Sequence, residues 1–375
     1  MSVPYAKLPR WVDIGLLPAV NVVIGFLVAG LVVIFLGENP WEALKLLIGG
    51  ALGSGRGLGS TLYFMTSFTF TGLAVAVAFH AGLFNIGGEG QAYVGGLGIA
   101  LACLALDPYM PWYVTFLFAL VLGMAFGALW AAVPAWLQAY RGSHVVITTI
   151  MFNFIAASLM VYLLVNWLKP LGSMDPSTRL FATDGGMVPS LRPLWGLFGA
   201  RLSSPPVNYT FFVALISAFL VWLLIWRSKL GYEIRAMGFS PSAAHYAGIN
   251  TARITMITMI ISGALAGMLG LNTIMGNVGK LTVDFVGGAG FVGIAVALMG
   301  RSHPIGVLLA ALLFGILYQG GGVLSFQMPA ISRDMIVVIQ ALVILFAGAL
   351  ENLVRPLLAA MLAGRVKSDA TGEAA

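Results

Sequence analysis

Long apolar runs recur along almost the whole chain, and most of them have the length of a membrane-spanning helix. A helix needs about 20 consecutive apolar residues to cross the hydrocarbon core of a bilayer. By that rule we expect about ten spans. They lie near residues 15–36, 58–79, 88–106, 112–138, 145–165, 209–226, 252–274, 286–300, 305–322 and 334–350. The pattern predicts an all-α polytopic membrane protein, with residues 1–375 forming a single transmembrane domain.

Composition agrees with lipid as the main solvent of this chain. Hydrophobic residues make up 60% of the sequence and charged residues only 9%, whereas soluble domains carry about 25% charged residues. The net charge of +6 comes from basic residues scattered between the apolar runs. Such scatter argues against nucleic acid as a partner. The single cysteine, Cys103, excludes an internal disulfide framework.

Two polar connectors separate groups of spans. The segment 166–208 is rich in Pro, Gly and Ser, which predicts an irregular extramembrane loop. The segment 227–253 is the most polar stretch between two long apolar runs and carries several Lys and Arg residues. Basic residues are enriched on the cytoplasmic side of membrane proteins. We therefore expect an extracytoplasmic loop at 166–208 and a cytoplasmic loop at 227–253.

Two short helices are predicted inside the loop 227–253. Gly238 is expected to end the first, and Ser240 to cap the second, with Pro241 at its first position. Gly248 is expected to end the second helix. This helix carries three small residues, Ala243, Ala244 and Ala247. A small-residue helix allows the backbone of another protein to approach closely, although a solvated connector would have the same composition.

An internal symmetry is visible in the order of spans. The segments 58–165 and 252–350 each contain four spans and start on opposite sides of the membrane, so we expect two inverted four-helix repeats. Each has a glycine-rich break after its first span, at 82–91 and at 275–293. Paired breaks of this kind point to the substrate path of a transporter. The alternative is that these glycines only allow close helix packing.

Five polar side chains in or near the apolar runs are candidate pathway residues. Glu89 lies in the first break, and a carboxylate at membrane depth needs partners or water. Two interpretations stay open for Glu89: a structural link to backbone amides across the break, or a side chain that faces the pathway. The other candidates are the amides Asn85, Gln91, Asn153 and Asn272. An Asn side chain in an apolar helix can instead form a hydrogen bond to a neighbouring helix, without any contact to a solute.

Motifs for catalysis are missing from the sequence. There is no G-x-x-x-x-G-K-[ST] phosphate-binding loop, so we do not expect this chain to hydrolyse ATP. No His, Cys, Asp and Glu residues show the spacing of a metal site. We therefore expect neither enzyme activity nor a bound cofactor or metal.

Five stretches in order carry a resemblance to one protein family. They are LFNIGGEGQ at 83–91, TTIMFNFIA at 148–156, EIRAMGFSPSAAHYAGIN at 233–250, SGALAGMLG at 262–270 and GIAVALMGRSHPIGVLLAALLFGIL at 293–317. The chain resembles permease subunits of binding-protein-dependent ABC importers, in the branched-chain amino acid, simple sugar and nucleoside group. The nucleoside-type permeases are the branch it looks most like. Two positions differ from that branch, because Val145 and Val292 stand where an acidic residue is common.

The resemblance implies a set of partners and a location. A permease of this kind lies in the inner membrane and works with an ABC ATP-binding subunit, which uses the ATP. It also works with a second related permease and an extracytoplasmic substrate-binding protein. The loop 227–253 would be the coupling loop that docks on the ATPase. Its expected docking residues are Arg235, Gly238, Pro241, Ala243, Ala244 and Gly248.

The expected solute is small and neutral. No Lys or Arg lies in the middle of a predicted span, so an anion would have no fixed positive partner. The available amides, hydroxyls and aromatic rings suit a nucleoside or, next, a simple sugar. A transporter of another class, an ion-coupled secondary transporter of a small polar solute, is the alternative. That mechanism normally needs ionisable residues inside the spans, and here Glu89 alone supplies one.

Overall fold

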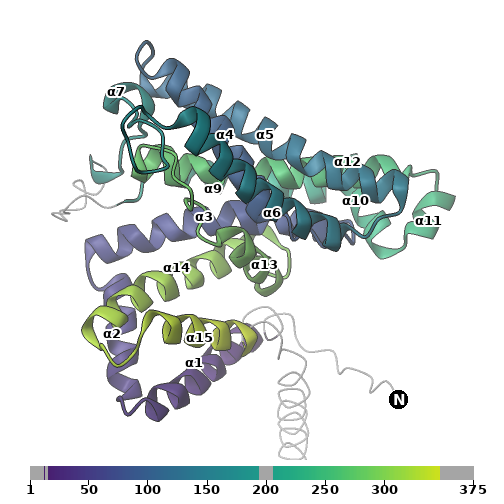
Figure 1. Ribbon diagram of the computed structural model, residues 1–375. Coiled ribbons are helices and arrows are strands. Elements are labelled where there is room, and N and C mark those ends of the chain that lie inside the picture. Colours follow the sequence, from purple (N-terminus) through teal and green to yellow (C-terminus); the bar gives the residue numbers. More distant parts are fainter. Residues whose placement is uncertain (1–11, 13–15, 194–205, 347–375) are drawn as a thin grey trace, which may run out of the picture. The chain divides into compact units, whose positions relative to one another are not determined.

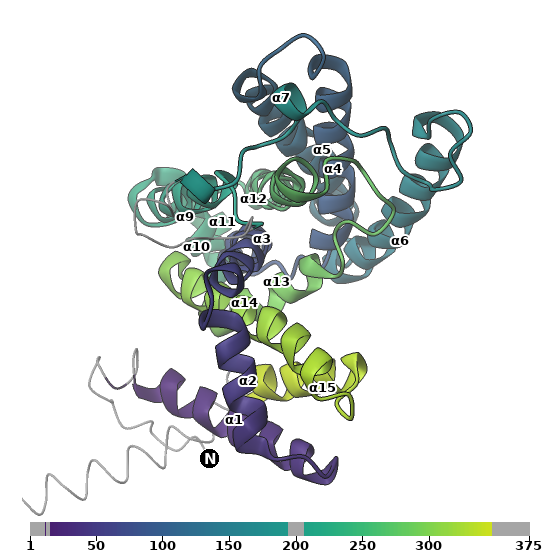
Figure 2. The ribbon, with the colours of Figure 1, turned by 90° about the vertical axis from the view of Figure 1, so that its left-hand side faces the viewer.

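The computed structural model describes residues 12, 16–193 and 206–346, and in these residues the chain is helical. No strand occurs in the described part, only two isolated β-bridges. This confirms the all-helical class. The chain divides into two compact units, Met1–Gly50 with Gly320–Ala375, and Ala51–Gln319. We describe each unit by itself (Figures 1 and 2).

The unit Ala51–Gln319 is a bundle of long helices with shorter ones at its ends. It contains α3 (Gly55–His80), α4 (Gly88–Leu106), α5 (Trp112–Arg141), α6 (Val145–Leu163), the π-helical η2 (Leu164–Leu168), α7 (Thr183–Gly186), α9 (Thr210–Arg227), α10 (Lys229–Phe239), α11 (Pro241–Tyr246), α12 (Thr251–Gly267), the π-helical η3 (Leu271–Val278), α13 (Ala289–Met299) and the first part of α14 (Pro304–Gln327). Helices α3, α4 and α12 are largely buried, and α5 packs against both α4 and α12. In the end-on view of Figure 2, α12 lies between α3, α4 and α5.

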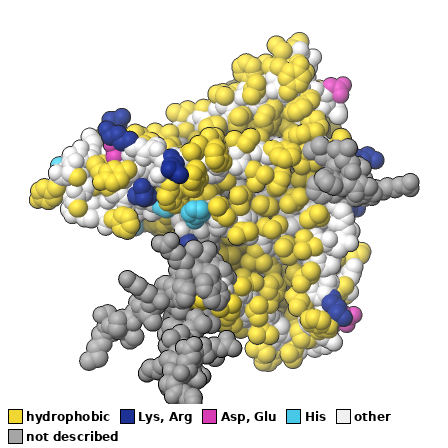
Figure 3. All heavy atoms as spheres, turned by 180° about the vertical axis from the view of Figure 1, so that it is seen from behind, with side chains coloured by type: hydrophobic (Ala, Val, Ile, Leu, Met, Phe, Trp, Pro, Cys, Tyr) yellow, Lys and Arg dark blue, Asp and Glu magenta, His cyan; other side chains and the backbone are white. Residues whose placement is uncertain are grey.

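Glycines allow the central helices to touch through their backbones. A Cβ atom at Gly127 would collide with the Gly263 carbonyl, and a Cβ atom at Gly267 would collide with the Gly123 carbonyl. These two G-x-x-x-G pairs therefore serve the close packing of α5 on α12. Helices α5 and α6 instead leave many apolar side chains exposed. Figure 3 shows apolar side chains over a broad face of the molecule seen from behind, as expected where lipid is the neighbour.

The described residues contain seven helices long and apolar enough to cross a membrane, or eight if a bent pair forms one span. The ten-span prediction is therefore not confirmed. The expected span at 286–300 corresponds to α13, which has only 11 residues because Gly287 and Gly288 adopt positive φ before it. The expected span at 334–350 corresponds to the 12-residue α15, and residues 347–350 lie outside the described part.

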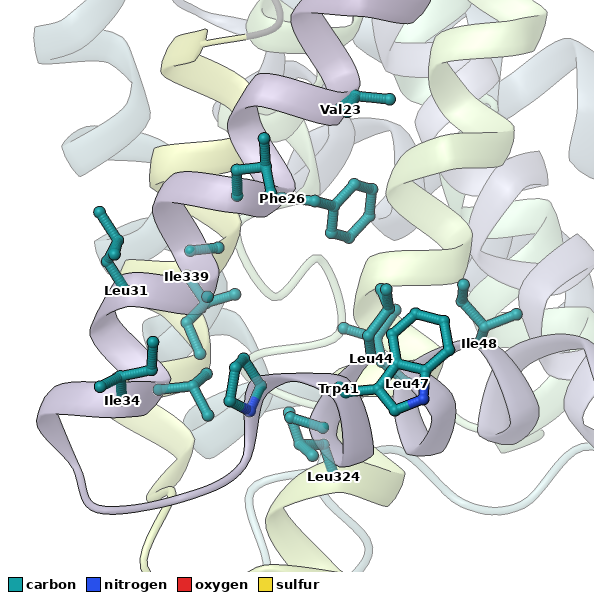
Figure 4. Close-up of a pocket in the computed structure, with 16 residues that line it drawn as sticks. Val23, Phe26, Leu31, Ile34, Trp41, Leu44, Leu47, Ile48, Leu324 and Ile339 are labelled. Atoms are coloured by element: carbon teal, nitrogen blue, oxygen red, sulfur yellow. The ribbon is translucent and has the colours of Figure 1, made fainter.

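The other unit contains α1 (Leu17–Phe35), α2 (Pro40–Leu52), the end of α14 and α15 (Arg333–Ile344). Helices α1 and α2 form the bent pair, at an angle of 119°. A cavity of about 570 Å³ lies between them and is lined almost entirely by apolar side chains (Figure 4). Recognition sites for polar molecules carry convergent polar groups. This cavity therefore suits an acyl chain or another apolar helix better than a polar solute.

The described part of the loop 166–208 is attached to the end of η3. Thr178 N–H donates to the Leu281 carbonyl at 3.0 Å, and Phe181 N–H donates to the Gly279 carbonyl at 2.8 Å. Further along the loop, Val188 N–H donates to the Met275 carbonyl at 3.0 Å. Main-chain bonds need no particular side chain, so the composition of the loop gave no sign of this attachment. The loop and the second glycine-rich break are thus one connected structure.

An ion pair between a buried carboxylate and an exposed guanidinium also holds this loop. Asp107 has a fully buried side chain, and its carboxylate accepts two hydrogen bonds from the Arg179 guanidinium, at 2.6 and 2.8 Å. It also accepts from Ala182 N–H at 2.7 Å. Burial raises the pKa of Asp107, but the Arg179 and Ala182 bonds outweigh this, so its pKa lies below the ordinary value of 3.8. The ionised carboxylate is therefore the stabilised form.

We predict that Asp107→Asn makes the protein less stable at neutral pH and less sensitive to acid. A carboxyl whose folded pKa is lowered stabilises the fold above its unfolded pKa and loses that contribution as pH falls through the folded value. The expected loss at about pH 7 is on the order of 1–3 kcal/mol. Thermal unfolding in detergent measures it, with Asp184→Asn as the control at an exposed acid. Equal stability of both variants at neutral pH would contradict the prediction.

Candidate functional site: two broken helices that meet

Both glycine-rich breaks are real interruptions of the helical backbone. The first separates α3 from α4, and Gly82 adopts a φ of +70° just after α3 ends. The second separates η3 from α13, with φ of +70° at Gly279, +57° at Gly287 and +79° at Gly288. L-residues with side chains rarely adopt these angles. Glycine is therefore what allows the chain to leave one helix and enter the next.

The Glu89 carboxylate joins the two breaks. Its Oε1 accepts from Gly288 N–H at 2.9 Å, and its Oε2 accepts from Gly290 N–H at 2.8 Å. Glu89 lies in the first turn of α4, and the two donors lie at the start of α13. A helix N-terminus has unpaired amides and a positive dipole end. One buried carboxylate thus lies between two helix N-termini that both favour a negative charge.

Close backbone contact reinforces this junction. A Cβ atom at Gly290 would collide with the backbone of Glu89, and a Cβ atom at Gly88 would contact the Gly290 carbonyl. Only glycine at position 290 brings the start of α13 near enough for its amides to reach the carboxylate. The geometry agrees with the structural interpretation of Glu89, as a link to backbone amides.

The predicted amides around the first break hold its irregular backbone. Asn85 and Gln91 form a reciprocal side-chain pair, at 3.0 and 3.2 Å. Asn85 also donates to the Ser262 hydroxyl of α12 at 2.9 Å and accepts from the Gly87 amide. Asn153, from α6, accepts from Gly90 N–H at 2.8 Å and donates to a backbone carbonyl of the break at 2.9 Å. The break is therefore fixed from two other helices.

Asn272 of η3, just before the second break, is likewise hydrogen-bonded to two other helices. Its Nδ2 donates to the Ser67 hydroxyl at 2.8 Å and to the Tyr63 carbonyl at 2.9 Å, both on α3. Its Oδ1 accepts from Asn208 and Thr210 at the start of α9. All five predicted pathway residues are buried and hydrogen-bonded within the chain. Their hydrogen bonds hold the backbone at and near the two breaks in place. Direct contact of these residues with a solute stays a prediction.

The sequence analysis missed several polar and aromatic groups at this junction. Tyr93 of α4 donates to Asp284 at 2.9 Å, and its ring packs edge-on against Phe285 at 5.5 Å. Tyr318 of α14 packs on Phe64 of α3, with ring centroids 5.7 Å apart. Aromatic residues in an apolar helix give no sequence signal, and Asp284 lies just outside the expected span at 286–300. Only the fold brings Tyr93 to Asp284, and Phe64 to Tyr318.

The helices of the loop 227–253 differ in part from the prediction. Helix α10 runs through Gly238 and ends at Phe239, so the expectation that Gly238 ends it is wrong. The start of α11 is as predicted, because the Ser240 hydroxyl accepts from Ala243 N–H at 3.3 Å. Gly248 follows α11 with a φ of +82°, which agrees with its predicted terminating role. A membrane-loop helix can include one glycine where packing requires it.

Two of the expected docking residues face the chain itself. A Cβ atom at Gly238 would collide with the His80 carbonyl, so α10 lies directly against the end of α3 where the first break begins. Ala244 is 3% exposed and contributes to the packing of α11. Pro241, Ala243 and Gly248 are exposed, and Arg235 is partly buried. The exposed surface of α11 is therefore smaller than the sequence indicated.

Replacing Glu89 with Gln should destabilise the junction between α4 and α13. The Gln side chain keeps one acceptor oxygen, but its NH₂ group would face a second backbone N–H. An unsatisfied buried donor costs about 1–3 kcal/mol, so we expect a lower melting temperature in detergent. Glu233→Gln is the control, because Glu233 forms only a loose surface pair with Lys229 at 3.9 Å, worth about 0.5 kcal/mol or less. The prediction fails if both variants melt together.

Comparisons with known proteins agree with the family resemblance. The family described as branched-chain amino acid transport system / permease component matches residues 57–348. The nucleoside ABC transporter permease protein NupB of Lactococcus lactis is 33% identical, over 88% of this chain and 90% of that protein. The guanosine ABC transporter permease protein NupP of Bacillus subtilis is 33% identical, over 89% and 93%. The glucose ABC transporter permease protein TsgB13 of Haloferax volcanii is 32% identical, over 92% and 89%.

Proposed function

Because this chain belongs to the family of branched-chain amino acid transport system permease components and is a multi-pass permease subunit of an ABC importer, we propose that its solute is a nucleoside. The observation that carries the proposal is the likeness, over most of both chains, to permeases named for nucleosides and guanosine. A neutral sugar is the second candidate, since a permease named for glucose is almost as similar. Family membership sets aside the ion-coupled secondary transporter.

The chemistry around the junction supports a neutral solute. Its polar groups are amides, hydroxyls and the two carboxylates Glu89 and Asp284, together with the aromatic rings of Tyr93, Phe64 and Tyr318. Neither carboxylate has an ion pair with Lys or Arg among the described residues. An anion would therefore meet like charges. A flat, hydroxyl-bearing molecule would find both hydrogen-bond acceptors and apolar ring surface.

We propose a working complex of several subunits in the inner membrane. Two ABC ATP-binding subunits would bind and hydrolyse ATP, a second related permease would complete the pathway, and an extracytoplasmic binding protein would deliver the solute. Exposed basic residues support a cytoplasmic position for α10 and α11. They are Arg227, Lys229 and Arg253 in this loop, and Arg141 and Arg301 in two short turns. In Figure 3, which is seen from behind, Lys and Arg gather at the left-hand end, where α10 and α11 lie.

The coupling step would pass from α11 to the first break. The ATP-binding subunit would contact the exposed side of α11, where Tyr246 is 94% exposed. A push on α11 would move α10, and Gly238 would transmit it to the end of α3 because the two backbones touch there. Glu89 then links the first break to α13. The expected inverted repeats, 58–165 and 252–350, would tilt against each other and open the pathway to alternate sides.

Adding a large charge to the exposed side of α11 should uncouple the importer. We predict that Ala243→Arg leaves the subunit folded, because Ala243 is exposed, but lowers uptake at least about tenfold by blocking close docking. Copurification with the ATP-binding subunit and ATP-dependent uptake measure the effect. Thr183→Arg, on the loop 166–208, is the matched control for copurification. Normal copurification and uptake by Ala243→Arg would rule out the docking role of α11.

Uptake by the reconstituted complex, with its own binding protein, tests the proposed solute. Labelled guanosine, uridine, glucose and leucine are offered separately, with and without ATP. We expect ATP-dependent uptake of nucleosides. Uptake of glucose alone would favour the second candidate, and uptake of leucine without nucleosides or glucose would contradict both.

A further inference from the structure

The segment between η3 and α13 has no helical structure, although it joins two parts of the membrane-embedded bundle. Residues 281–288 lead from the end of η3 to Gly288, whose amide binds the Glu89 carboxylate. Backbone of this kind is tolerated at membrane depth only where protein covers it or where it lines a water-filled cavity. Asp284 and Gly287 are both exposed in this chain. The segment therefore presents a wet surface or one covered by the second permease.

Asp284 is held in a defined position on this surface. The hydroxyl of Tyr93, a residue 8% exposed on the buried helix α4, donates to its Oδ1 at 2.9 Å. The neighbouring Phe285 packs edge-on against the Tyr93 ring, which fixes the phenol. Among the described residues, no protein group donates to Oδ2 of Asp284 and no Lys or Arg pairs with it. An ionised carboxylate accepts at both oxygens, so one oxygen remains open to a ligand.

A separate cluster of aromatic rings lies on α3 and α14. Tyr318 is half-buried and contacts the rings of Phe64 and Phe68, at 5.7 and 4.9 Å between centroids. The Glu89 oxygens themselves are both occupied by backbone amides. Asp284, rather than Glu89, is therefore the acidic group at this junction that is available to a solute.

We infer that Asp284, positioned by Tyr93, is a solute-binding residue that accepts hydrogen bonds from the ribose hydroxyls of a nucleoside in the pathway. This rests on the proposed function. A carboxylate suits vicinal hydroxyls because it offers acceptors only, and charge-assisted hydrogen bonds are stronger than neutral ones. Tyr93 is a positioning residue, since its hydroxyl is engaged with the carboxylate.

The central test compares ribonucleosides with 2′,3′-dideoxyribonucleosides in the reconstituted complex with its binding protein. Asp284→Asn should lower ribonucleoside uptake about tenfold or more, the effect of losing a hydrogen bond to a charged group. It should change dideoxyribonucleoside uptake much less, because these lack the hydroxyls. The same binding protein serves every variant, so its own selectivity cancels in the comparison. Asp184→Asn, an exposed acid on α7, should leave both rates unchanged. An equal loss for both substrates, or no loss, would overturn the inference.

A second pair of measurements covers the case in which Asp284→Asn fails to assemble. Tyr93→Phe removes only the positioning hydroxyl and should raise the KM for ribonucleosides more than it lowers kcat. Asp284→Cys in a Cys103→Ala background should react with a small impermeant thiol reagent, and guanosine should protect it. No reaction, or no protection by any transported solute, would overturn the inference.

The same labelling separates this inference from the proposed function. If the wild-type complex carries a sugar and no nucleoside, the proposed nucleoside function fails. Protection of Asp284→Cys by that sugar would then still support Asp284 as a hydroxyl-binding residue. Nucleoside uptake without any protection would leave the proposed function standing and remove the site.

Discussion

The Glu89 carboxylate, shared between the amides of Gly288 and Gly290, is the interaction on which the rest of the arrangement depends. A buried charge needs compensation, and here two helix N-termini supply it with amides and dipoles. The residues around this carboxylate are those that its two hydrogen bonds require. Glycine at 290 allows the approach, and glycines at 287 and 288 turn the chain into α13. Asn85, Gln91 and Asn153 then fix the facing break.

Each polar loop packs on one of the two breaks. On one side, Gly238 of α10 touches the end of α3 just before the first break. On the other, the loop 166–208 bonds through its backbone to Gly279 and Leu281, at the end of η3. A force applied to either loop thus acts close to the junction rather than through a long chain of side chains.

Features that depend on local sequence, such as helices and their caps, could be predicted. Features that depend on contacts between distant residues could not. Apolar length predicted the helical bundle, and capping chemistry predicted the start of α11 at Ser240. The ten-span count is not confirmed, in part because two positive-φ glycines precede the short helix α13. Gly238 continues a helix that lies against His80, which is distant in sequence, and Ala244 is buried where α11 packs with α10 and α12. No local pattern reveals either contact. The partners of Glu89 are likewise about two hundred residues away along the chain.

Amide hydrogen exchange in the assembled complex, followed by mass spectrometry on peptides covering residues 286–292, measures the central interaction directly. The account predicts that this segment exchanges slowly in the wild type and about tenfold or more faster in Glu89→Ala, because the carboxylate that holds its amides is gone. Peptides from α5 should exchange equally in both proteins. Fast exchange of residues 286–292 in the wild type, or the same rate in both proteins, would contradict the account.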